Sequence, residues 1–185
     1  MVITTSPLVK TYTLQEFWNL PEPADRMKLE LIKGVLYMTP PPREIHDEVF
    51  GALNRELQRA IDRHGYKGTI LAPRAALWID DDTHLEPDLM YVSDRLKREM
   101  GQGHRTRADI VVEILSSKTA LYDRTTKSDT YRAMGVPEMW LVDLESKEIE
   151  VRSFEMNKTS IYKTDEAVCS KVLPEIRIPV GALFT

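Results

Sequence analysis

The run Asp109-Ile110-Val111-Val112-Glu113-Ile114-Leu115 has the composition of a β-strand and carries a carboxylate, Glu113, in its interior. Valine and isoleucine favour strands because their branched side chains pack well on a pleated surface. An ionised carboxylate next to a packed core costs free energy unless it is paired or bound to a cation. The run therefore predicts a strand of the core that contains an acid in need of a partner.

A second strand-like run, Glu86-Pro87-Asp88-Leu89-Met90-Tyr91-Val92, also contains an acid in its interior. If the two runs form an antiparallel hairpin around Met100-Gly101, Asp88 and Glu113 face each other on neighbouring strands. Side chains placed in this way are within reach of one ion. We therefore predict a pair of carboxylates on adjacent strands.

The composition is that of one compact domain covering residues 1–185. With 42% hydrophobic and 29% charged residues, the chain can bury a sizeable core. Its one cysteine, Cys169, excludes an internal disulfide and a cysteine cluster for zinc. Residues 1–10 lack a basic segment followed by an apolar core, and no run approaches the roughly 20 apolar residues of a membrane span. We expect a cytoplasmic protein with no membrane partner.

The overall charge argues against indiscriminate binding to nucleic acid. The net charge is -4 and the isoelectric point about 5.6, so any contact with phosphate has to be local. The basic residues concentrate in one segment: Arg95, Lys97, Arg98, His104, Arg105 and Arg107. A solvated hairpin loop is the simpler interpretation, and a loop that contacts phosphate or forms an oligomer is the alternative. At about 3.3 Å per residue, the loop is expected roughly 20 Å from the carboxylates.

Three segments have helical patterns. Residues 13–20 begin with a capping box formed by Thr13 and Glu16 and end before Pro21. Residues 44–64 repeat apolar side chains at helical spacing and stop at Gly65. Residues 122–134 form the third segment, which is closed by Gly135-Val136-Pro137.

Strand patterns alternate with these helices. A tight hairpin is predicted for residues 29–38, and further strands for 68–72, 75–79, 88–93, 109–115 and 139–143, with a polar connection at 80–83. An antiparallel extension at the C-terminal end is predicted for residues 148–154, 160–163 and 176–180. This order of elements predicts an α/β (α+β) fold with a mixed central sheet and a crossover through the third helix.

The nearest cation in sequence to Glu113 lies on that third helix. Glu113 and Leu115 point the same way from their strand, and Leu115 cannot neutralise charge. Asp123, Lys127 and Tyr131 follow one another at helical i,i+4 spacing, so the stripe that they form can face the strand. A pair of Asp123 and Lys127 on the surface explains the same spacing, and both interpretations stay open.

These residues together resemble a known family. The similarity is carried by Pro87-Asp88, Val111-Val112-Glu113-Ile114-Leu115-Ser116-Ser117, Asp123-Arg124 with Lys127 and Tyr131, and Gly135-Val136-Pro137-Glu138-Met139-Trp140-Leu141-Val142-Asp143. It extends upstream through Leu29-Glu30-Leu31-Ile32-Lys33-Gly34-Val35-Leu36 and the proline-rich turn before His46. The chain resembles the Uma family of restriction-endonuclease-like proteins, within the PD-(D/E)XK nuclease superfamily, from about residue 13 to 180.

The resemblance implies a restriction-endonuclease-like core in which Asp88 and Glu113 bind a divalent metal. The superfamily usually has a lysine two residues after the strand acid, where this chain has Leu115. The resemblance suggests that Lys127 replaces it from the helix. Mg²⁺ or Mn²⁺ suits these residue types, because hard cations prefer oxygen ligands and are commonly held by one or two carboxylates plus substrate phosphate.

Supporting roles are open for three further residues. Glu30 either adds a carboxylate to the site or is a charged residue on an edge strand. His46 begins the long helix, where a polar helix-start residue is the simpler interpretation and a hydrogen bond to a ligand the alternative. Tyr131 belongs to the stripe that carries Lys127.

Two functions follow from this pattern. The first is a metal-dependent endonuclease that hydrolyses phosphodiester bonds in DNA, with Asp88, Glu113 and Lys127 as its catalytic residues. The alternative, motivated by Leu115 and the acidic isoelectric point, is a catalytically inactive, nuclease-derived module that binds nucleic acid or protein. A homodimer is expected in addition, because the strands of the C-terminal extension offer free edges.

Overall fold

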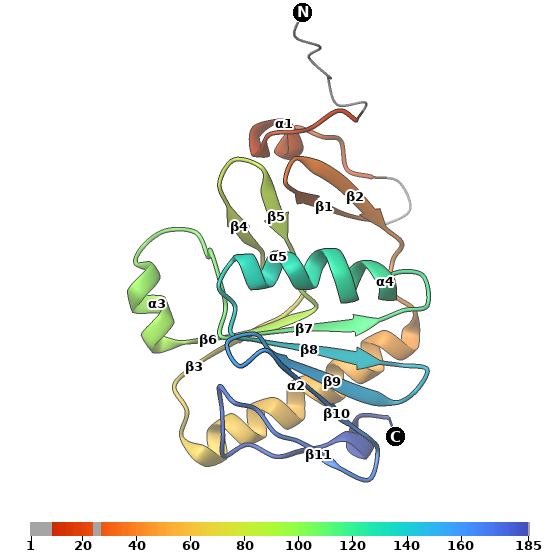
Figure 1. Ribbon diagram of the computed structural model, residues 1–185, viewed down its shortest axis with the longest axis vertical. Coiled ribbons are helices and arrows are strands. Elements are labelled where there is room, and N and C mark those ends of the chain that lie inside the picture. The colour runs from red at the N-terminus through yellow and green to blue at the C-terminus, as the bar shows by residue number, and fades with distance from the viewer. Residues whose placement is uncertain (1–8, 24–26, 185) are drawn as a thin grey trace, which may run out of the picture.

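A six-stranded mixed sheet forms the centre of the computed structural model, which describes residues 9–23 and 27–184 (Figure 1). The strand order is β10-β9-β8-β7-β6-β3. The strands are Gly68–Leu71 (β3), Leu89–Ser93 (β6), Ile110–Leu115 (β7), Glu138–Asp143 (β8), Glu148–Ser153 (β9) and Lys158–Tyr162 (β10). β7 and β8 run parallel and the other neighbours run antiparallel, which confirms the predicted mixed sheet. The expectation about residues 1–10 falls mostly on residues outside those described.

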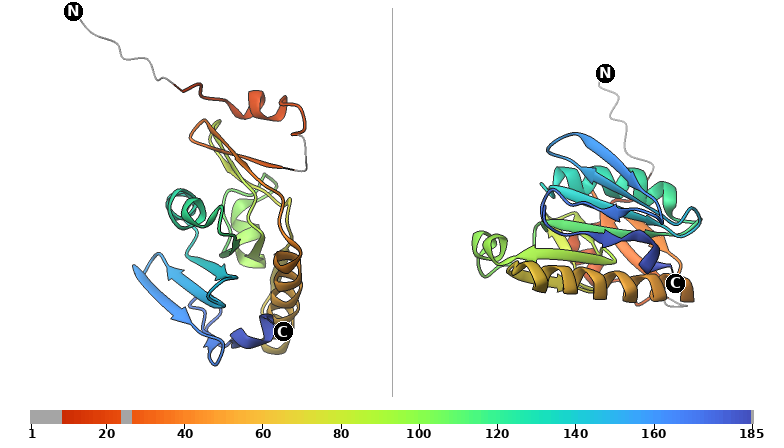
Figure 2. Two further views of the ribbon diagram at one scale, coloured as in Figure 1. Left: turned by 90° about the vertical axis from the view of Figure 1, so that its right-hand side faces the viewer. Right: turned by 90° about the horizontal axis from the view of Figure 1, so that it is seen from below.

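Helices cover both faces of this sheet (Figure 2). α2 (Glu44–His64) lies on one face, and the helical segment 120–133 lies on the other. Val112 packs in a core with α2, whereas Val111 packs in a second core with the opposite helix. Successive strand residues point to opposite faces, so Glu113 shares the face of Val111. The strand acid therefore faces the helix that carries the predicted lysine.

The predicted antiparallel pairing of the two acid-bearing strands is confirmed. Leu89 pairs with Val112 and Tyr91 with Ile110. Asp88 directly precedes β6, and the same register extended by one residue places it opposite Glu113.

The long helix α2 has the bounds that its sequence predicts. Val49, Leu53 and Leu57 are buried along one side of it. Gly65 ends the helix with φ 70°, a left-handed conformation that glycine adopts without steric cost.

A second sheet of four strands, in the order β2-β1-β5-β4, lies beside the helix that crosses between β7 and β8 (Figure 1). Its strands are Lys28–Ile32 (β1), Val35–Thr39 (β2), Leu77–Ile79 (β4) and Thr83–Leu85 (β5). The predicted tight hairpin is confirmed, with Lys33 and Gly34 both at positive φ in its turn. α1 (Leu14–Trp18) has the predicted capping box. β5 is a correction, because the sequence predicts a polar connection into Thr83 and no strand after it.

The crossover helix contains a feature that the sequence does not predict. It consists of α4 (Ala120–Tyr122), a π-helical turn (Asp123–Lys127) and α5 (Ser128–Ala133), and it ends at Gly135 with φ 76°. A π turn closes each backbone hydrogen bond over one more residue than an α turn, and such turns are frequent at functional sites. The helix predicted for residues 122–134 is thus present, with Asp123 and Lys127 in its wider turn.

The basic segment between β6 and β7 is a helix in its first half and not the predicted loop. α3 (Asp94–Met100) begins with Ser93 as its N-cap. Arg95 and Arg107 both contact Glu99, at 2.7 and 3.1 Å. Part of the positive charge is therefore paired within the protein itself.

The C-terminal region extends the central sheet as predicted for residues 148–154 and 160–163, whereas residues 176–180 lie outside that sheet. β9 and β10 form an antiparallel hairpin, and a two-stranded ribbon of β11 (Ala167–Val168) and β12 (Ile178–Pro179) follows, then a 3₁₀ turn (Val180–Leu183). Across residues 9–23 and 27–184, no helix has both the length and the apolar character needed to cross a membrane.

Candidate active site

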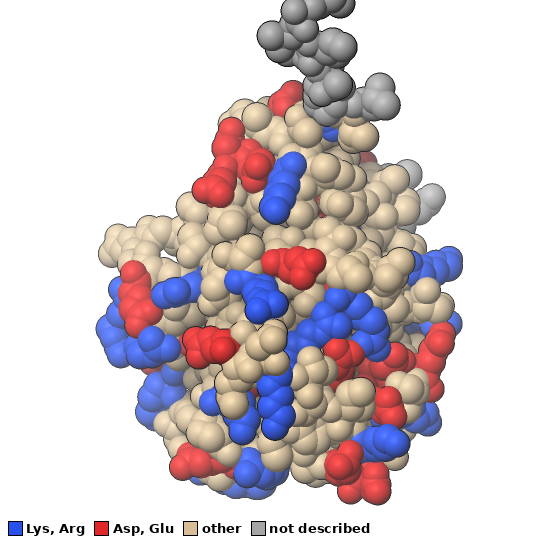
Figure 3. Space-filling model, in the orientation of Figure 1, with Lys and Arg blue, Asp and Glu red and all other residues tan. Residues whose placement is uncertain are grey.

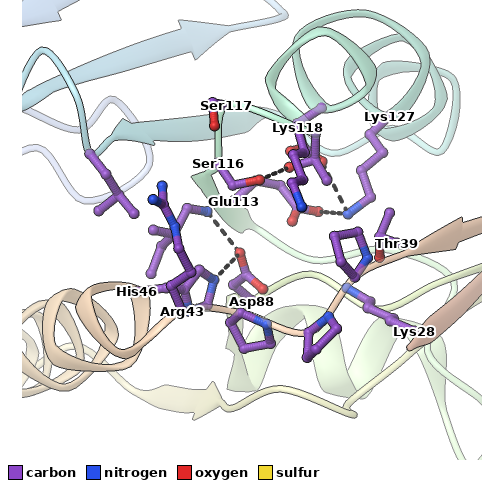
Figure 4. A pocket seen from close by; sticks show the side chains of 17 residues that line it. Lys28, Thr39, Arg43, His46, Asp88, Glu113, Ser116, Ser117, Lys118 and Lys127 are labelled. Atoms are coloured by element: carbon purple, nitrogen blue, oxygen red, sulfur yellow. Dashed lines mark hydrogen bonds and ion pairs between the residues drawn. The ribbon is translucent and has the colours of Figure 1, made fainter. Parts of the chain in front are cut away.

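Asp88 is held by one of its two carboxylate oxygens. Oδ2 accepts a hydrogen bond from the backbone N–H of Ile114 at 2.8 Å and lies 3.2 Å from Nε2 of His46 (Figure 4). Burial opposes ionisation, but the hydrogen bond from His46 and the positive charge of Lys28 lower the pKa of Asp88 to about 2. Asp88 is thus a fixed carboxylate that is ionised at neutral pH.

His46 reaches this acid from the first turn of α2. Burial disfavours its charged form, but the hydrogen bond and charge of Asp88 outweigh this effect and raise the pKa of His46. The side chain is more than a polar group at a helix start, because it orients a carboxylate of the site. Neither interpretation of His46 from the sequence predicts this contact with Asp88.

Glu113 is almost completely enclosed, with 2% of its surface exposed. Oε1 accepts hydrogen bonds from Nζ of Lys127 at 2.8 Å and from the hydroxyl of Tyr131 at 2.6 Å. Burial and the nearby negative charge of Asp88 raise the pKa of Glu113 to about 8, although Lys127 acts in the opposite direction. At neutral pH, Asp88 therefore favours its ionised form and Glu113 its protonated form.

Lys127 connects the crossover helix to both sheets. Its Nζ lies 2.8 Å from Glu113, 3.2 Å from Glu30 and 3.5 Å from Asp123. Burial favours the neutral amine, but these carboxylates raise the pKa of Lys127 well above its usual value. The interpretation of Asp123 and Lys127 as a surface pair is wrong, since both side chains are buried.

Glu30 is a buried partner of this lysine. β1 lies between β2 and β5, so the interpretation of Glu30 as a residue on an edge strand is wrong. Its carboxylate accepts the backbone N–H of Glu86 at 3.0 Å and the hydroxyl of Tyr122 at 3.3 Å, and it lies 3.3 Å from Nζ of Lys28. Desolvation raises the pKa of Glu30, and the lysines more than offset this, so its pKa is lowered. Glu30 lies behind Lys127 and does not line the cavity described next.

Asp88, Glu113 and Lys127 line one cavity of about 380 Å³. The proline turn 40–42 and the start of α2 form one side of it, and the loop 116–119 that follows β7 forms the other (Figure 4). Three further cations line it: Lys28, Arg43 and Lys118. The sequence patterns give these cations no role, although Arg43 directly precedes the predicted helix 44–64 and Lys118 lies three residues after the predicted strand 109–115. That position is the signal that could have identified them, because loops at element ends commonly carry binding residues.

The charges around the cavity suit a divalent cation. Four buried or half-buried acids gather here against two amines that contact them: Glu30, Asp88, Glu113 and Asp123 against Lys28 and Lys127. When all four acids are ionised and His46 is neutral, these two amines leave two negative charges, which a divalent cation would compensate. Within the described residues, no hydrogen bond engages Oδ1 of Asp88 or Oε2 of Glu113.

The donor set is also of the kind that Mg²⁺ uses. Among residues 9–23 and 27–184, no group of three or more His, Cys, Asp or Glu side chains is arranged to hold a metal. Mg²⁺ is commonly held by only one or two carboxylates, with water and substrate phosphate completing its coordination. The residues present therefore fit Mg²⁺ or Mn²⁺, and they do not form an all-protein cage.

The surface outside the cavity lacks a uniform charge on the face shown in Figure 3. Lysine and arginine side chains alternate there with aspartate and glutamate, in keeping with the net charge of -4. This face therefore offers no extended patch of positive charge that would attract a polyanion.

Comparisons with known proteins identify the family and the fold. The sequence model of Uma2, described as "Putative restriction endonuclease", matches residues 14–181. A solved structure described as a putative nuclease belonging to DUF820, from Anabaena variabilis ATCC 29413, is similar with a TM-score of 0.74 and 19% sequence identity. The similarity covers 94% of this chain and 97% of that one, and at this identity it shows a shared fold. No curated protein matches the chain significantly.

Proposed function

The chain belongs to the Uma2 family of restriction-endonuclease-like proteins, and on this premise we propose that it is a metal-dependent endonuclease that hydrolyses phosphodiester bonds in DNA. The observation that carries the proposal is the contact of Lys127 with Glu113 at 2.8 Å, in the cavity that Asp88 also lines. Hydrolysis of a phosphodiester needs charge neutralisation at the phosphate and a positioned water. Two acids and one ammonium group provide the residues for both tasks.

Asp88 and Glu113 are the proposed ligands of Mg²⁺ or Mn²⁺. The ion supplies Lewis-acid stabilisation of the charge that develops on the phosphate oxygens. Asp88 is prepared for this role because His46 and the N–H of Ile114 hold one oxygen, which leaves the other for the ion. Glu113 has to lose its proton first, since its pKa of about 8 favours the neutral acid.

Lys127 is the proposed catalytic cation. Its ammonium group stays charged next to the carboxylates and lines the cavity in which the phosphate binds. It can stabilise the phosphate charge or orient the attacking water. Tyr131 is a positioning residue, because its hydroxyl donates to the same oxygen of Glu113 as Lys127 does.

Titration of the protein with Mg²⁺ or Mn²⁺ on labelled single- and double-stranded DNA tests the proposal. We expect metal-dependent cleavage by the wild type and loss of cleavage to background for Asp88→Asn and Lys127→Met. Asp129→Asn, at an exposed position of α5, is the control and keeps full activity. Equal product from wild type and Asp88→Asn under every metal rejects the proposal.

The alternative of an inactive binding module is motivated by Leu115 in place of the usual strand lysine and by the acidic isoelectric point. The contact of the Lys127 ammonium group with the strand acid from the helix supports the active enzyme over that alternative. Binding of DNA that survives Glu113→Gln, without cleavage under any metal, is the result that favours the module.

A further inference from the structure

A second cavity of about 370 Å³ adjoins the proposed catalytic cavity. It lies between β2 and the N-terminal part of the crossover helix. Four residues line both cavities: Thr39, Pro40, Lys118 and Thr119. The two spaces are therefore neighbours along one surface, and a chain bound in the first can continue into the second.

The second cavity is more apolar than its neighbour. Met38 from β2 and Leu121 from α4 line it, and they are 56% and 77% exposed. Tyr37 and Tyr122 also line it, with their rings stacked at 4.7 Å between centroids, and Thr125 and Thr126 add hydroxyl groups. Large apolar side chains exposed beside a cavity mark a binding surface more often than a packing defect.

Lys118 stands at the junction of the two cavities. Its side chain has no hydrogen bond or ion pair within the part of the chain that the structure describes, and it is exposed. An unpaired ammonium group at this position can bind a phosphate between the two cavities. An apolar site next to a phosphate-binding cation matches the chemistry of a nucleotide.

We propose that this second cavity, lined by Tyr37, Met38, Leu121 and Tyr122, is a nucleobase subsite for the nucleotide next to the scissile phosphate. The inference rests on the proposed function and narrows its substrate. A base inside a duplex is stacked and paired, so only an unpaired or extruded base can pack against these side chains. The preferred substrate is therefore DNA with a single-stranded or distorted segment.

Measurement of binding without cleavage tests the subsite. The probes are a short labelled oligothymidylate and an abasic deoxyribose-phosphate oligomer of the same length, both in EDTA. We expect Met38→Ala and Leu121→Ala to weaken binding of oligothymidylate about tenfold, the range of a lost base contact. Binding of the abasic oligomer stays unchanged in both variants, because this probe has no base to contact Met38 or Leu121 and its phosphates still contact Lys118.

Met156→Ala is the matched control. Met156 is also 56% exposed, and it lies in the turn between β9 and β10, outside both cavities. Three results overturn the subsite: the same affinity for oligothymidylate in Met38→Ala and Met156→Ala, an equal loss of affinity for the abasic oligomer, or no binding of oligothymidylate by the wild type. A change of mass in light scattering caused by Leu121→Ala also overturns it, because the surface is then an interface between copies of the chain.

The subsite and the proposed function can fail separately. Selective loss of oligothymidylate binding in a protein that cleaves nothing under any metal keeps the subsite and rejects the endonuclease. Metal-dependent cleavage by the wild type, together with Met38→Ala and Leu121→Ala variants that bind oligothymidylate as well as Met156→Ala does, keeps the endonuclease and rejects the subsite.

Discussion

Asp88 and Glu113 differ in proton affinity although they face each other on adjacent strands. His46, the backbone N–H of Ile114 and a nearby lysine favour the ionised form of Asp88, whose pKa is about 2. Glu113 is buried more completely. Burial and the negative charge of Asp88 favour its protonated form and give it a pKa of about 8. The site without metal therefore holds one ionised and one protonated acid at neutral pH.

The protonated state of Glu113 predicts a pH dependence of stability. The folded pKa of about 8 exceeds the ordinary value of 4.5, so the folded protein keeps a proton that the unfolded chain releases between these values. The free energy of unfolding should therefore fall as pH rises from about 4.5 to about 8. Urea denaturation in EDTA across this range, on wild type and Glu113→Gln, measures it; parallel pH profiles for the two proteins contradict the assignment.

His46 is expected to act on metal affinity through Asp88. Loss of a side chain that orients a metal ligand typically costs about 10- to 100-fold in affinity or activity. We expect His46→Ala to raise the Mg²⁺ concentration for half-maximal cleavage by about tenfold or more, with a smaller effect at saturating metal. His64→Ala, at the last residue of the same helix, should leave the metal titration unchanged. An unshifted titration for His46→Ala shows that Asp88 needs no orienting partner.

At the scale of elements, the crossover helix completes the site. Its π turn carries Asp123 and Lys127, and its next turn carries Tyr131. β7 contributes Glu113 and β1 contributes Glu30, so the cluster joins both sheets to this helix. Removal of the lysine leaves buried carboxylates without compensation.

Lys127→Met should therefore destabilise the fold, by about 3–5 kcal/mol at a pH where Glu113 is ionised. Glu113→Gln added to Lys127→Met should recover part of this loss, because one uncompensated charge is gone. Urea denaturation of the wild type, both single variants and the double variant at pH 9 gives the coupling free energy. Additive effects within about 0.5 kcal/mol mean that the two side chains do not interact.

Much of the fold could be predicted from local pattern. The spacing of apolar residues and Gly65 set the bounds of α2, and the register of β6 against β7 followed from where the two acids lie. β5 could not be predicted, because three residues carry too little periodicity. The π turn was missed for a different reason, since it depends on which carbonyl each N–H contacts and not on residue type.

The candidate site divides in the same way. Acids inside strand patterns are conspicuous, so Asp88 and Glu113 could be identified, and helical spacing together with the family resemblance pointed to Lys127. Arg43 and Lys118 lie in irregular segments, where no periodicity distinguishes a residue that lines a cavity from any solvated cation. Their position beside the cavity depends on tertiary structure.

For the molecule as a whole, cation binding should stabilise the folded state. A ligand that binds only the folded protein adds about 2.7 kcal/mol at a concentration of 100 times its Kd. We expect Mg²⁺ to raise the melting temperature, and to do so more at pH 9 than at pH 6, because Glu113 has to lose its proton to bind the ion. Thermal unfolding with and without Mg²⁺ measures this effect. Asp88→Asn should lose it, and an equal shift in that variant places the ion elsewhere.

The expected homodimer is a proposal that belongs to the same scale. β3 and β10 are the outer strands of the central sheet, and Ile161 on β10 is 55% exposed. Pairing of β10 with its copy would cover this residue and satisfy a free edge. Light scattering should give twice the mass of one chain for the wild type and the mass of one chain for Ile161→Lys, with Ile45→Lys as the control at another exposed isoleucine. A wild-type protein with the mass of one chain contradicts the dimer.

Because the ammonium group that contacts the strand acid comes from a helix, different positions of the chain are free to be substituted. Position 115 is freed from chemistry and has only to fill the core, where Leu115 packs. Under the proposed function, Lys127, 14 residues downstream of the acid that it contacts, bears the constraint instead. Exchange of Leu115 for another apolar residue of similar size is then tolerated, and relatives of this chain are better recognised by the interval from strand acid to helical lysine than by a compact motif of adjacent residues.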